Sequence, residues 1–290
     1  MYYNALSPYL KARFGGKVNK LALSSGCSCP NRDGLSLLED GSKNFGGCTF
    51  CTGSGEFAAS SLAPIPEQLE QAKYILGKKG QDARYITYFQ ENTNTYGPVS
   101  RLEPLFRAAM EPEDVVALSV ATRPDCLGPD MLAMLARLRA VKPVWVELGL
   151  QTIHEATAAR IRRGYPLPVF DKAMRDLHTI GIEVIVHLIL GLPGETAADM
   201  EASSRYVGRC GAEGVKLHLL HILRGTPMAA EYAAGRVRTL ELDEYITLLE
   251  RCLEVLPPEV VIHRLTGDAP KRDLIAPPWS ADKKRVLNAI

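Results

Sequence analysis

Four cysteines near the start of the sequence have a spacing that could bind a metal centre. Cys48 and Cys51 form a Cys-x-x-Cys pair, and 18 residues separate Cys29 from Cys48. Two thiolates three positions apart can reach one metal, and a loop lets a distant third thiolate join them. Soft thiolates select zinc, copper(I) or iron–sulfur clusters. With Cys27 included, four thiolates would suit a structural zinc site; with three, a 4Fe–4S cluster would keep one iron free of protein ligands. The cysteines alone leave both possibilities open.

Polar residues also recur on one face of several predicted strands. Over residues 144–152, Glu147, Gly149 and Gln151 follow Trp145 at every second position, with apolar residues between them. This is the period of a β-strand, whereas a fully buried parallel strand would be apolar on both faces. The polar face therefore predicts the lining of a barrel lumen, in which Gly149 makes space. Neighbouring strands would add Ser119, Ala121, Arg123, His187, Ile189, Gly191, Lys216 and His218.

These strands belong to an alternating series of strands and helices. Strands are predicted at 17–25, 84–90, 115–123, 144–152, 182–191 and 215–223, and helices at 64–79, 100–111, 128–140, 168–180 and 196–209. Such alternation favours a parallel sheet with right-handed crossovers. We therefore expect an α/β fold, an incomplete (β/α)6 TIM-like barrel with its chemistry at the C-terminal ends of the strands. A single domain over 1–290 would comprise a core of about 17–225 and an extension of about 226–290, with helices and a short strand at 260–267.

The composition predicts a cytoplasmic protein without a membrane segment. The chain has 290 residues, of which 46% are hydrophobic and 23% charged, with a net charge of +1, as is ordinary for globular proteins. No stretch resembles a signal peptide or approaches the roughly 20 apolar residues of a membrane span. Thiols stay reduced in the cytoplasm, so seven cysteines favour metal ligation over disulfides. Basic residues exceed acidic ones at both ends, over 1–35 and 263–290, which could suit a polyanion or be solvated surface.

Several longer motifs, taken in order, resemble one family. They are CPNRDG (29–34), GGCTFC (46–51), TRPD (122–125), VELGLQT (146–152), HLILGLPGET (187–196), KLHLLHILRGTP (216–227) and HRLTGDAP (263–270). Together they resemble the small stand-alone radical S-adenosylmethionine (SAM) proteins related to the Elongator catalytic subunit, the YhcC/YtqA-like subgroup. The resemblance covers nearly the whole chain. One departure is Tyr165, which stands where the family has a histidine.

The resemblance implies an enzyme that uses a 4Fe–4S cluster and SAM. Cys29, Cys48 and Cys51 would hold the cluster, whereas Cys27 would be a packed residue. SAM would be cleaved reductively to a 5′-deoxyadenosyl radical, with an electron from a flavodoxin-type or ferredoxin-type donor. The chain would be too short to include the acetyltransferase domain of the Elongator subunit.

Roles toward SAM can be assigned to six residues, most of them with a simpler alternative. Glu147 would accept hydrogen bonds from the ribose or form a buried ion pair, for example with Arg123. Gln151 would bind the ribose or methionyl group, or cap the next helix. Gln90 and Asn94 would bind the methionyl amine, or make a turn. Arg163 would pair with the methionyl carboxylate, or be an exposed helix-end arginine. Gly191 would let the backbone approach the adenine.

The substrate implied by the resemblance is tRNA, at the side chain of the wobble uridine. The reaction would convert a carboxymethylaminomethyl group to an aminomethyl group. We expect Lys216 and His218 at the substrate end of the lumen, and Arg264 and Lys271 as further candidate contacts. One alternative is a radical SAM enzyme acting on a small molecule or peptide. The other is a zinc-stabilised, non-catalytic barrel that binds RNA or protein.

Overall fold

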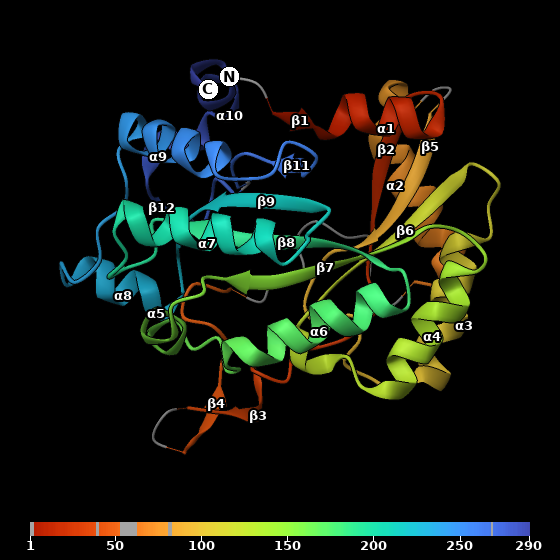
Figure 1. Cartoon of the computed structure of the whole chain (residues 1–290), viewed down its shortest axis with the longest axis horizontal. Coiled ribbons are helices and arrows are strands. Elements are labelled where there is room, and N and C mark those ends of the chain that lie inside the picture. Colours follow the sequence, from red (N-terminus) through yellow and green to blue (C-terminus); the bar gives the residue numbers. More distant parts are fainter. Residues whose placement is uncertain (1–2, 39–40, 53–62, 81–82, 268) are drawn as a thin grey trace.

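The computed structural model describes residues 3–38, 41–52, 63–80, 83–267 and 269–290. Its main sheet is parallel and curls into an incomplete barrel (Figure 1). Six strands follow one another across this sheet in chain order, so the predicted (β/α)6 topology is confirmed. They are β2 (Val18–Leu23), β5 (Arg84–Phe89), β6 (Val115–Thr122), β7 (Val144–Gln151), β8 (Glu183–Leu190) and β9 (Gly214–Leu219).

Helices cover the outer face of the barrel, close to the predicted positions. On α6, buried residues recur at helical spacing (Phe170, Ala173, Met174 and Leu177), which is the pattern of an amphipathic helix packed on a sheet. Several of these helices have a proline at or next to their first residue, where its missing N–H costs nothing. They are α2 (Ile65–Leu76), α3 (Val99–Met110), α4 (Pro129–Arg139), α6 (Leu167–Thr179) and α7 (Ala197–Arg209).

The two faces of the strands divide as the period-two pattern predicts. On β7, Val144, Val146, Leu148 and Leu150 belong to the large core between sheet and helices. Trp145 belongs to a second cluster, inside the barrel. The predicted inward face is therefore confirmed for this strand.

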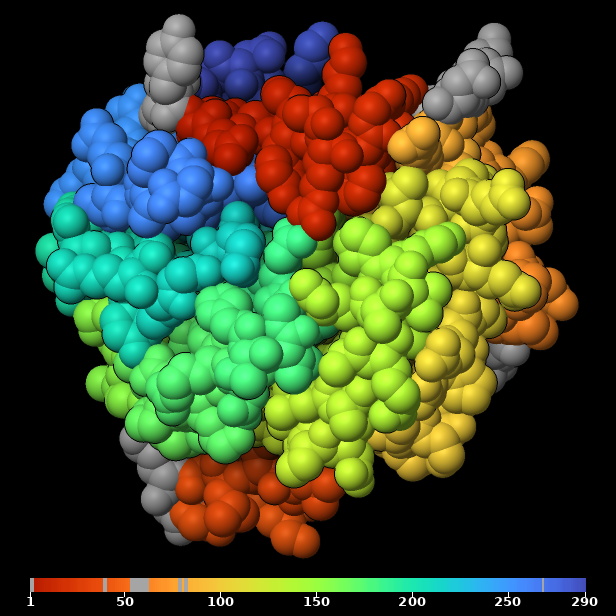
Figure 2. Space-filling view, turned by 45° about the vertical axis from the view of Figure 1, so that its right-hand side comes forward, coloured from red at the N-terminus to blue at the C-terminus, as the bar shows by residue number. Residues whose placement is uncertain are grey.

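A helix absent from the sequence-based prediction closes the N-terminal end of the barrel. In α1 (Leu6–Phe14), Leu10 is buried against the inward residues Ile86, Ala117, Trp145 and Ile185. These residues form an apolar floor beneath the lumen. The outer side of α1 shows as red spheres beside the blue C-terminal segment in Figure 2.

The C-terminal extension joins the barrel through the main sheet. The strand expected at 260–267 is β11 (Val261–Arg264), which pairs in parallel with β9 and, on its other side, with β1 (Asn4–Ala5). Both therefore belong to the eight-stranded main sheet. The remaining elements of this part are β10 (Ile222–Leu223), α8 (Pro227–Ala233), α9 (Leu242–Glu254), β12 (Leu274–Ala276), the 3-10 helix η3 (Pro278–Ala281) and α10 (Lys283–Ala289).

The segment between Cys29 and Cys48 contains a hairpin that was also not predicted. Strands β3 (Asp33–Leu37) and β4 (Lys43–Phe45) pair antiparallel and project from the barrel in Figure 1. Three further short helices complete the described chain: η1 (Gly77–Gly80), η2 (Pro124–Cys126) and α5 (Glu155–Arg160). Across the described ranges, no helix is both long and apolar enough to span a membrane.

Candidate active site at the barrel mouth and in the lumen

Asn31 organises the loop that carries the three candidate cysteine ligands. Its buried amide nitrogen donates to Cys48 Sγ at 3.3 Å and to the carbonyl oxygen of Arg162 at 2.6 Å. Its amide oxygen accepts a hydrogen bond from Asn44 at 2.7 Å. A Cβ on Gly164 would lie 2.5 Å from that oxygen, so only glycine allows this approach. The loop is thereby tied to the segment that follows α5.

The three candidate thiols are electrostatic neighbours. Burial, with Cys51 and Cys29 as further causes, raises the pKa of the Cys48 thiol to about 12. Cys48 accepts a backbone hydrogen bond from Cys51 N at 3.0 Å through its carbonyl oxygen. In the part of the chain that is described, no three Cys, His, Asp or Glu side chains converge as ligands of a single metal ion. The set Cys29, Cys48 and Cys51 stays a prediction as cluster ligands.

Cys27 lies apart from this set, as the family resemblance implies. Its Sγ accepts a hydrogen bond from Arg101 Nη2 at 2.8 Å and lies 3.9 Å from the carbonyl oxygen of Asn94. Its side chain is buried in the core. This arrangement does not support a zinc site that includes Cys27.

The middle of the lumen holds a layer of hydrogen-bonded polar residues centred on Glu147. Its carboxylate is buried in the barrel, 1% exposed, between strands β2, β5, β6, β8 and β9. Five donors contact its two oxygens: Lys20 Nζ at 3.0 Å, Ser119 Oγ at 2.9 Å, Tyr88 Oη at 2.7 Å, His187 Nε2 at 2.8 Å and Lys216 Nζ. We call these six residues the lumen layer.

The predicted ion-pair alternative for Glu147 is therefore half right. Glu147 does form buried ion pairs, but with Lys20 and Lys216. Arg123 instead pairs with Asp125 at 2.7 Å and donates to the carbonyl oxygen of Arg163. The ribose contact of Glu147 stays a prediction, and it would require one of the five donors to move.

Burial and charge set the protonation states of the lumen layer. Burial would raise the pKa of Glu147, but Lys20 and Lys216 hold it well below its usual range. Burial lowers the pKa of Lys216 to about 7, against the opposing effect of Glu147. Burial and Lys216 lower the pKa of His187 to about 4. Burial also places the pKa of His218 well below its usual value. Both histidines are therefore neutral at pH 7.

A cavity of about 230 Å³ lies above this layer and joins it to the cysteine loop. Phe50 lies between Cys48 and Cys51 in the sequence, and its ring lines the same cavity as His187 and His218. The backbone of Thr49 is fixed on both sides, by bonds with Ile161 and Met228. We call this space the lumen cavity; its walls are Phe50, Gln151, His187, Ile189, His218, Leu219, Leu220, His221 and Leu223.

Gln151 and Tyr165 shape the end of β7 at this cavity. Gln151 has a left-handed backbone with φ of 70°, which is uncommon outside glycine and frequent at functional sites. A Cβ on Gly149 would lie 2.8 Å from Gln151 Nε2, so the space predicted at Gly149 is occupied by the end of the Gln151 side chain. The hydroxyl of Tyr165 donates to the carbonyl oxygen of Gly149. Tyr165 thus has a structural contact in the place where the family has histidine.

Two other predicted SAM-binding side chains are already engaged in the fold. The Asn94 amide nitrogen lies 2.8 to 3.0 Å from the carbonyl oxygens of Phe89, Glu91 and Ala121. The alternative of an exposed Arg163 is wrong, because its side chain is buried. Its guanidinium donates to the carbonyl oxygens of Leu150, Thr152 and Tyr165 and contacts Glu155. Contacts of Asn94 and Arg163 with SAM stay predictions.

The remaining candidate residues lie at different places. Gln90 follows β5 and is partly buried. Gly191, with φ of 89°, lines a separate cavity of about 190 Å³ beside Arg160 and Val237. Arg264 ends β11, and its charge lowers the pKa of Lys216 and His187. Lys271 is exposed on the loop before β12, so the structure groups Arg264, but not Lys271, with the lumen.

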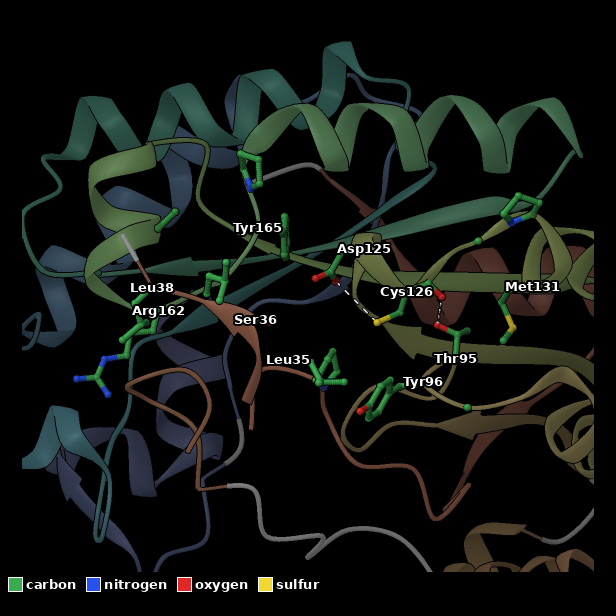
Figure 3. A pocket seen from close by; sticks show the side chains of 18 of the residues that line it. Leu35, Ser36, Leu38, Thr95, Tyr96, Asp125, Cys126, Met131, Arg162 and Tyr165 are labelled. Atoms are coloured by element: carbon green, nitrogen blue, oxygen red, sulfur yellow. Dashed lines mark hydrogen bonds between the residues drawn. The ribbon is translucent and has the colours of Figure 1, made fainter. Parts of the chain in front are cut away.

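A second, wider cavity was missed by the sequence-based prediction. It measures about 950 Å³ and lies between the β3–β4 hairpin, η2 and the segment around Tyr165 (Figure 3). Leu35, Tyr96 and Cys126 are among its lining residues. This cavity could not be expected from the sequence, because the hairpin that forms one of its walls was not predicted. Of the predicted site residues, none lines this cavity, so the candidate active site is the lumen cavity.

Comparison with known proteins identifies the type of barrel. Residues 44–207 match the model of the radical SAM superfamily, and residues 212–290 match the radical SAM C-terminal domain. The uncharacterized protein YtqA of Bacillus subtilis is 42% identical over 99% of this chain and 88% of its own length. A tRNA uridine(34) acetyltransferase of Methanocaldococcus jannaschii is 27% identical over 53% of this chain and 29% of its own length. The structure of Elp3 from Methanocaldococcus infernus has a TM-score of 0.68 at 18% identity, covering 89% of this chain and 58% of that one.

The residues present fit the cofactors of this superfamily, which are a 4Fe–4S cluster and SAM. Thiolates are the ligands of such clusters, and three neighbouring thiols stand on a loop at the barrel mouth. The loop that carries two of them also lines the lumen cavity, through Phe50. A cofactor held by these thiols would lie next to a cavity whose walls combine apolar side chains with Gln151, His187, His218 and His221.

Proposed function

This chain belongs to the radical SAM superfamily, and on that premise we propose that it modifies the wobble uridine of tRNA. The reaction would convert a carboxymethylaminomethyl side chain to an aminomethyl side chain. The carboxymethyl carbon would lose one hydrogen atom to the 5′-deoxyadenosyl radical and one electron to the iron–sulfur centre, and water would split the C–N bond of the resulting iminium to release glyoxylate. Support for this substrate comes from the relatives, one of which is named for its action on tRNA uridine 34.

The observation that carries the proposal is the lumen cavity. The Cys48–Cys51 loop lines this cavity together with Gln151 and two inward histidines. Cys29, Cys48 and Cys51 would hold the cluster. When bound, the cluster and SAM supply a 5′-deoxyadenosyl radical, which can take hydrogen from an unactivated carbon. The cavity is wide enough for a uridine side chain, not for a folded RNA, so the wobble base would have to enter from the barrel mouth.

The chain's own residues orient the substrate and exclude water. The apolar floor, against which α1 packs, closes the N-terminal end of the lumen. Apolar side chains around Phe50, among them Ile161, Ile189 and Leu220, pack at the other end. Such enclosure protects a reactive radical from side reactions. The lumen layer supplies polar contacts within this closed space.

Two partners follow from the proposed reaction. A low-potential protein of flavodoxin or ferredoxin type would supply the electron. The tRNA would be held in part through its phosphates, so its binding should weaken steeply as salt rises. A gel-shift titration with total tRNA at several salt concentrations tests the second partner.

The deciding experiment compares wobble nucleosides in tRNA from cells with and without the gene. We expect carboxymethylaminomethyl-uridine to accumulate without the gene, and the wild-type gene to reverse this. A Cys48→Ala gene should fail to do so, whereas Cys210→Ala, a cysteine at the end of α7, should succeed. Unchanged wobble nucleosides would refute the tRNA substrate. Formation of deoxyadenosine by the reduced protein would then still point to radical chemistry on a small molecule or peptide.

A further inference from the structure

Glu147 is the single carboxylate of the lumen layer among the described residues, and it faces the amino groups of both Lys20 and Lys216. A buried charge is costly unless an opposite charge accompanies it. Burial lowers the pKa of Lys216 to about 7, so one carboxylate does not fully stabilise two ammonium groups here. A further anion beside Lys216 would stabilise its charged form.

Glu147 cannot serve as the contact for that ligand, because its acceptor capacity is used. A carboxylate offers about four lone-pair positions, and five donors already contact Glu147. Lys216, in contrast, has three ammonium hydrogens. It contacts two acceptors, Glu147 and the hydroxyl of Tyr88 at 2.8 Å. Lys216 keeps one ammonium hydrogen for a further oxygen. It is buried behind the cavity wall, next to His187, with which it shares one oxygen of Glu147.

In its Nε2–H tautomer, His218 can supply a second donor next to Lys216. Both residues lie on the inward face of β9, one pleat apart, and His218 lines the lumen cavity. Its Nε2 atom is buried and has no hydrogen-bond partner within the described residues. An unpaired buried polar atom at a cavity wall is a group that a ligand would satisfy.

His187 offers the opposite kind of contact. Because Glu147 is an ionised acceptor, His187 Nε2 must carry the hydrogen in the 2.8 Å bond between them. The imidazole is neutral, so its Nδ1 atom is an acceptor. The ring lies 5.2 Å from that of His218, centroid to centroid, on the neighbouring strand. An acceptor and two donors thus stand side by side.

We propose that the lumen cavity binds a zwitterionic group of the N-substituted glycine type. Its carboxylate accepts hydrogen bonds from Lys216 and His218, and its secondary ammonium donates to His187 Nδ1. This rests on the proposed function, in which the group is the carboxymethylaminomethyl side chain. The aminomethyl product lacks the carboxylate and would leave Lys216 and His218 without that partner, so it should bind more weakly.

The test is a comparison of two anticodon stem-loop RNAs that differ only in the wobble side chain, one carboxymethylaminomethyl and one aminomethyl. Their affinities for the reconstituted protein with SAM are measured without reductant, so that no turnover occurs. We expect about tenfold tighter binding of the carboxylated RNA, as for one charge-assisted hydrogen bond. A second arm compares acetate with acetamide at equal ionic strength, by the shift of the unfolding midpoint.

Two variants remove the proposed donors in different ways. Lys216→Met removes the ammonium but leaves Glu147 with Lys20. His218→Leu removes an imidazole whose Nε2 has no hydrogen-bond partner among the residues that the structure describes, so folding should tolerate it. Each should abolish most of the preference for the carboxylated RNA while keeping affinity for the aminomethyl RNA. Lys17→Met, an exposed lysine, is the matched control and should keep the full preference.

The outcomes separate this proposal from the proposed function. A preference for the carboxylated RNA that is lost in Lys216→Met and in His218→Leu supports both the carboxylate site and the tRNA substrate. Equal binding of the two RNAs, together with a preference for acetate that the variants lose, supports the carboxylate site and counts against tRNA as substrate. No preference in either arm, or a preference that neither Lys216→Met nor His218→Leu changes, overturns the carboxylate site.

Discussion

At the scale of single residues, one buried carboxylate sets the chemistry of the lumen. Glu147 fixes the tautomer of His187 and holds Lys216 against Tyr88. The cost of burying this carboxylate is offset by five hydrogen-bond donors, each of which comes from a different strand. The same burial keeps the neighbouring histidines neutral, which has a measurable consequence.

Stability should fall as the pH is lowered from about 6.5 to about 4. The unfolded chain protonates its histidines near pH 6.5, whereas His187 in the folded chain does so only near pH 4. In this window the unfolded state binds more protons, so acid favours it. The groups that act on His187 are Glu147, Lys216, His218 and Arg264.

The variant His187→Gln, whose amide can still donate to Glu147, measures this effect. It should reduce the slope of unfolding free energy against pH by about 1.4 kcal/mol per unit, the value of one proton. Urea denaturation at several pH values gives the slope. His178→Gln, at a partly exposed position on α6, is the control. An identical slope in the unaltered protein and His187→Gln would contradict the assignment.

Gly149→Ala should disturb the part of the lumen cavity where Gln151 is predicted to bind SAM. The new Cβ would lie 2.8 Å from Gln151 Nε2, so the Gln151 side chain must move. We expect little loss of stability, because the atom that must move is the far end of a flexible side chain, but weaker SAM binding. Gly16→Ala, where a Cβ meets nothing within 4 Å, should change neither quantity. Equilibrium SAM titration of the reconstituted protein checks this, and unchanged affinity would remove Gln151 from the site.

At the scale of elements, the cysteine loop depends on contacts that lie far apart in the sequence. Asn31 links it to β4 through Asn44 and to the segment after α5 through Arg162. Thr49 links it to α5 and α8. Outside the β3–β4 hairpin the loop has little regular structure, so these bonds must hold the thiols in place.

Asn31→Ala should therefore weaken retention of the cluster without unfolding the barrel. Removing a hydrogen bond to a metal ligand typically costs about 10- to 100-fold in metal affinity. We expect faster loss of iron to a chelator, followed by absorbance, with an unchanged circular dichroism spectrum. Asn288→Ala, at an exposed position on α10, is the control. Equal rates of iron loss in both variants would show that Asn31 has no such role.

At the scale of the whole molecule, the two chain ends meet in one sheet. Strand β1 pairs with β11, and β11 pairs with β9 of the barrel. The C-terminal part is also fixed by Trp279, whose indole donates to the carbonyl oxygen of Leu240 at 3.0 Å and packs against Tyr245. These contacts favour unfolding as a single unit.

The two tryptophans can test this, because one reports on each part. Trp145 lies in the floor of the lumen and Trp279 in the C-terminal part. In Trp279→Phe the fluorescence reports on the barrel, and in Trp145→Phe on the extension. We expect the fluorescence midpoint in urea to match the circular dichroism midpoint within each variant. Separate midpoints in one variant would indicate two independently unfolding units.

The sequence by itself determined the barrel and the inward face of its strands. Period-two alternation on β7 and helical spacing on α6 are local signals, because neighbouring residues impose them directly. Trp145, Glu147, Lys216 and His218 could therefore be assigned to the lumen before any coordinates. The motifs around the cysteines are also local, because each is a run of consecutive residues, and they indicated the family.

Only the tertiary structure decided which residues meet. Glu147 could have paired with Arg123, and Arg163 could have been exposed; the fold gives Glu147 two lysines from other strands and buries Arg163 under three carbonyl groups. The elements α1 and β1 were missed because they are short and contact distant parts of the chain. The β3–β4 hairpin was missed because its strands have only five and three residues. The contact between Lys20 and Glu147 joins residues 127 positions apart. Such contacts leave no periodic trace in the sequence, since they depend on how the whole sheet curls.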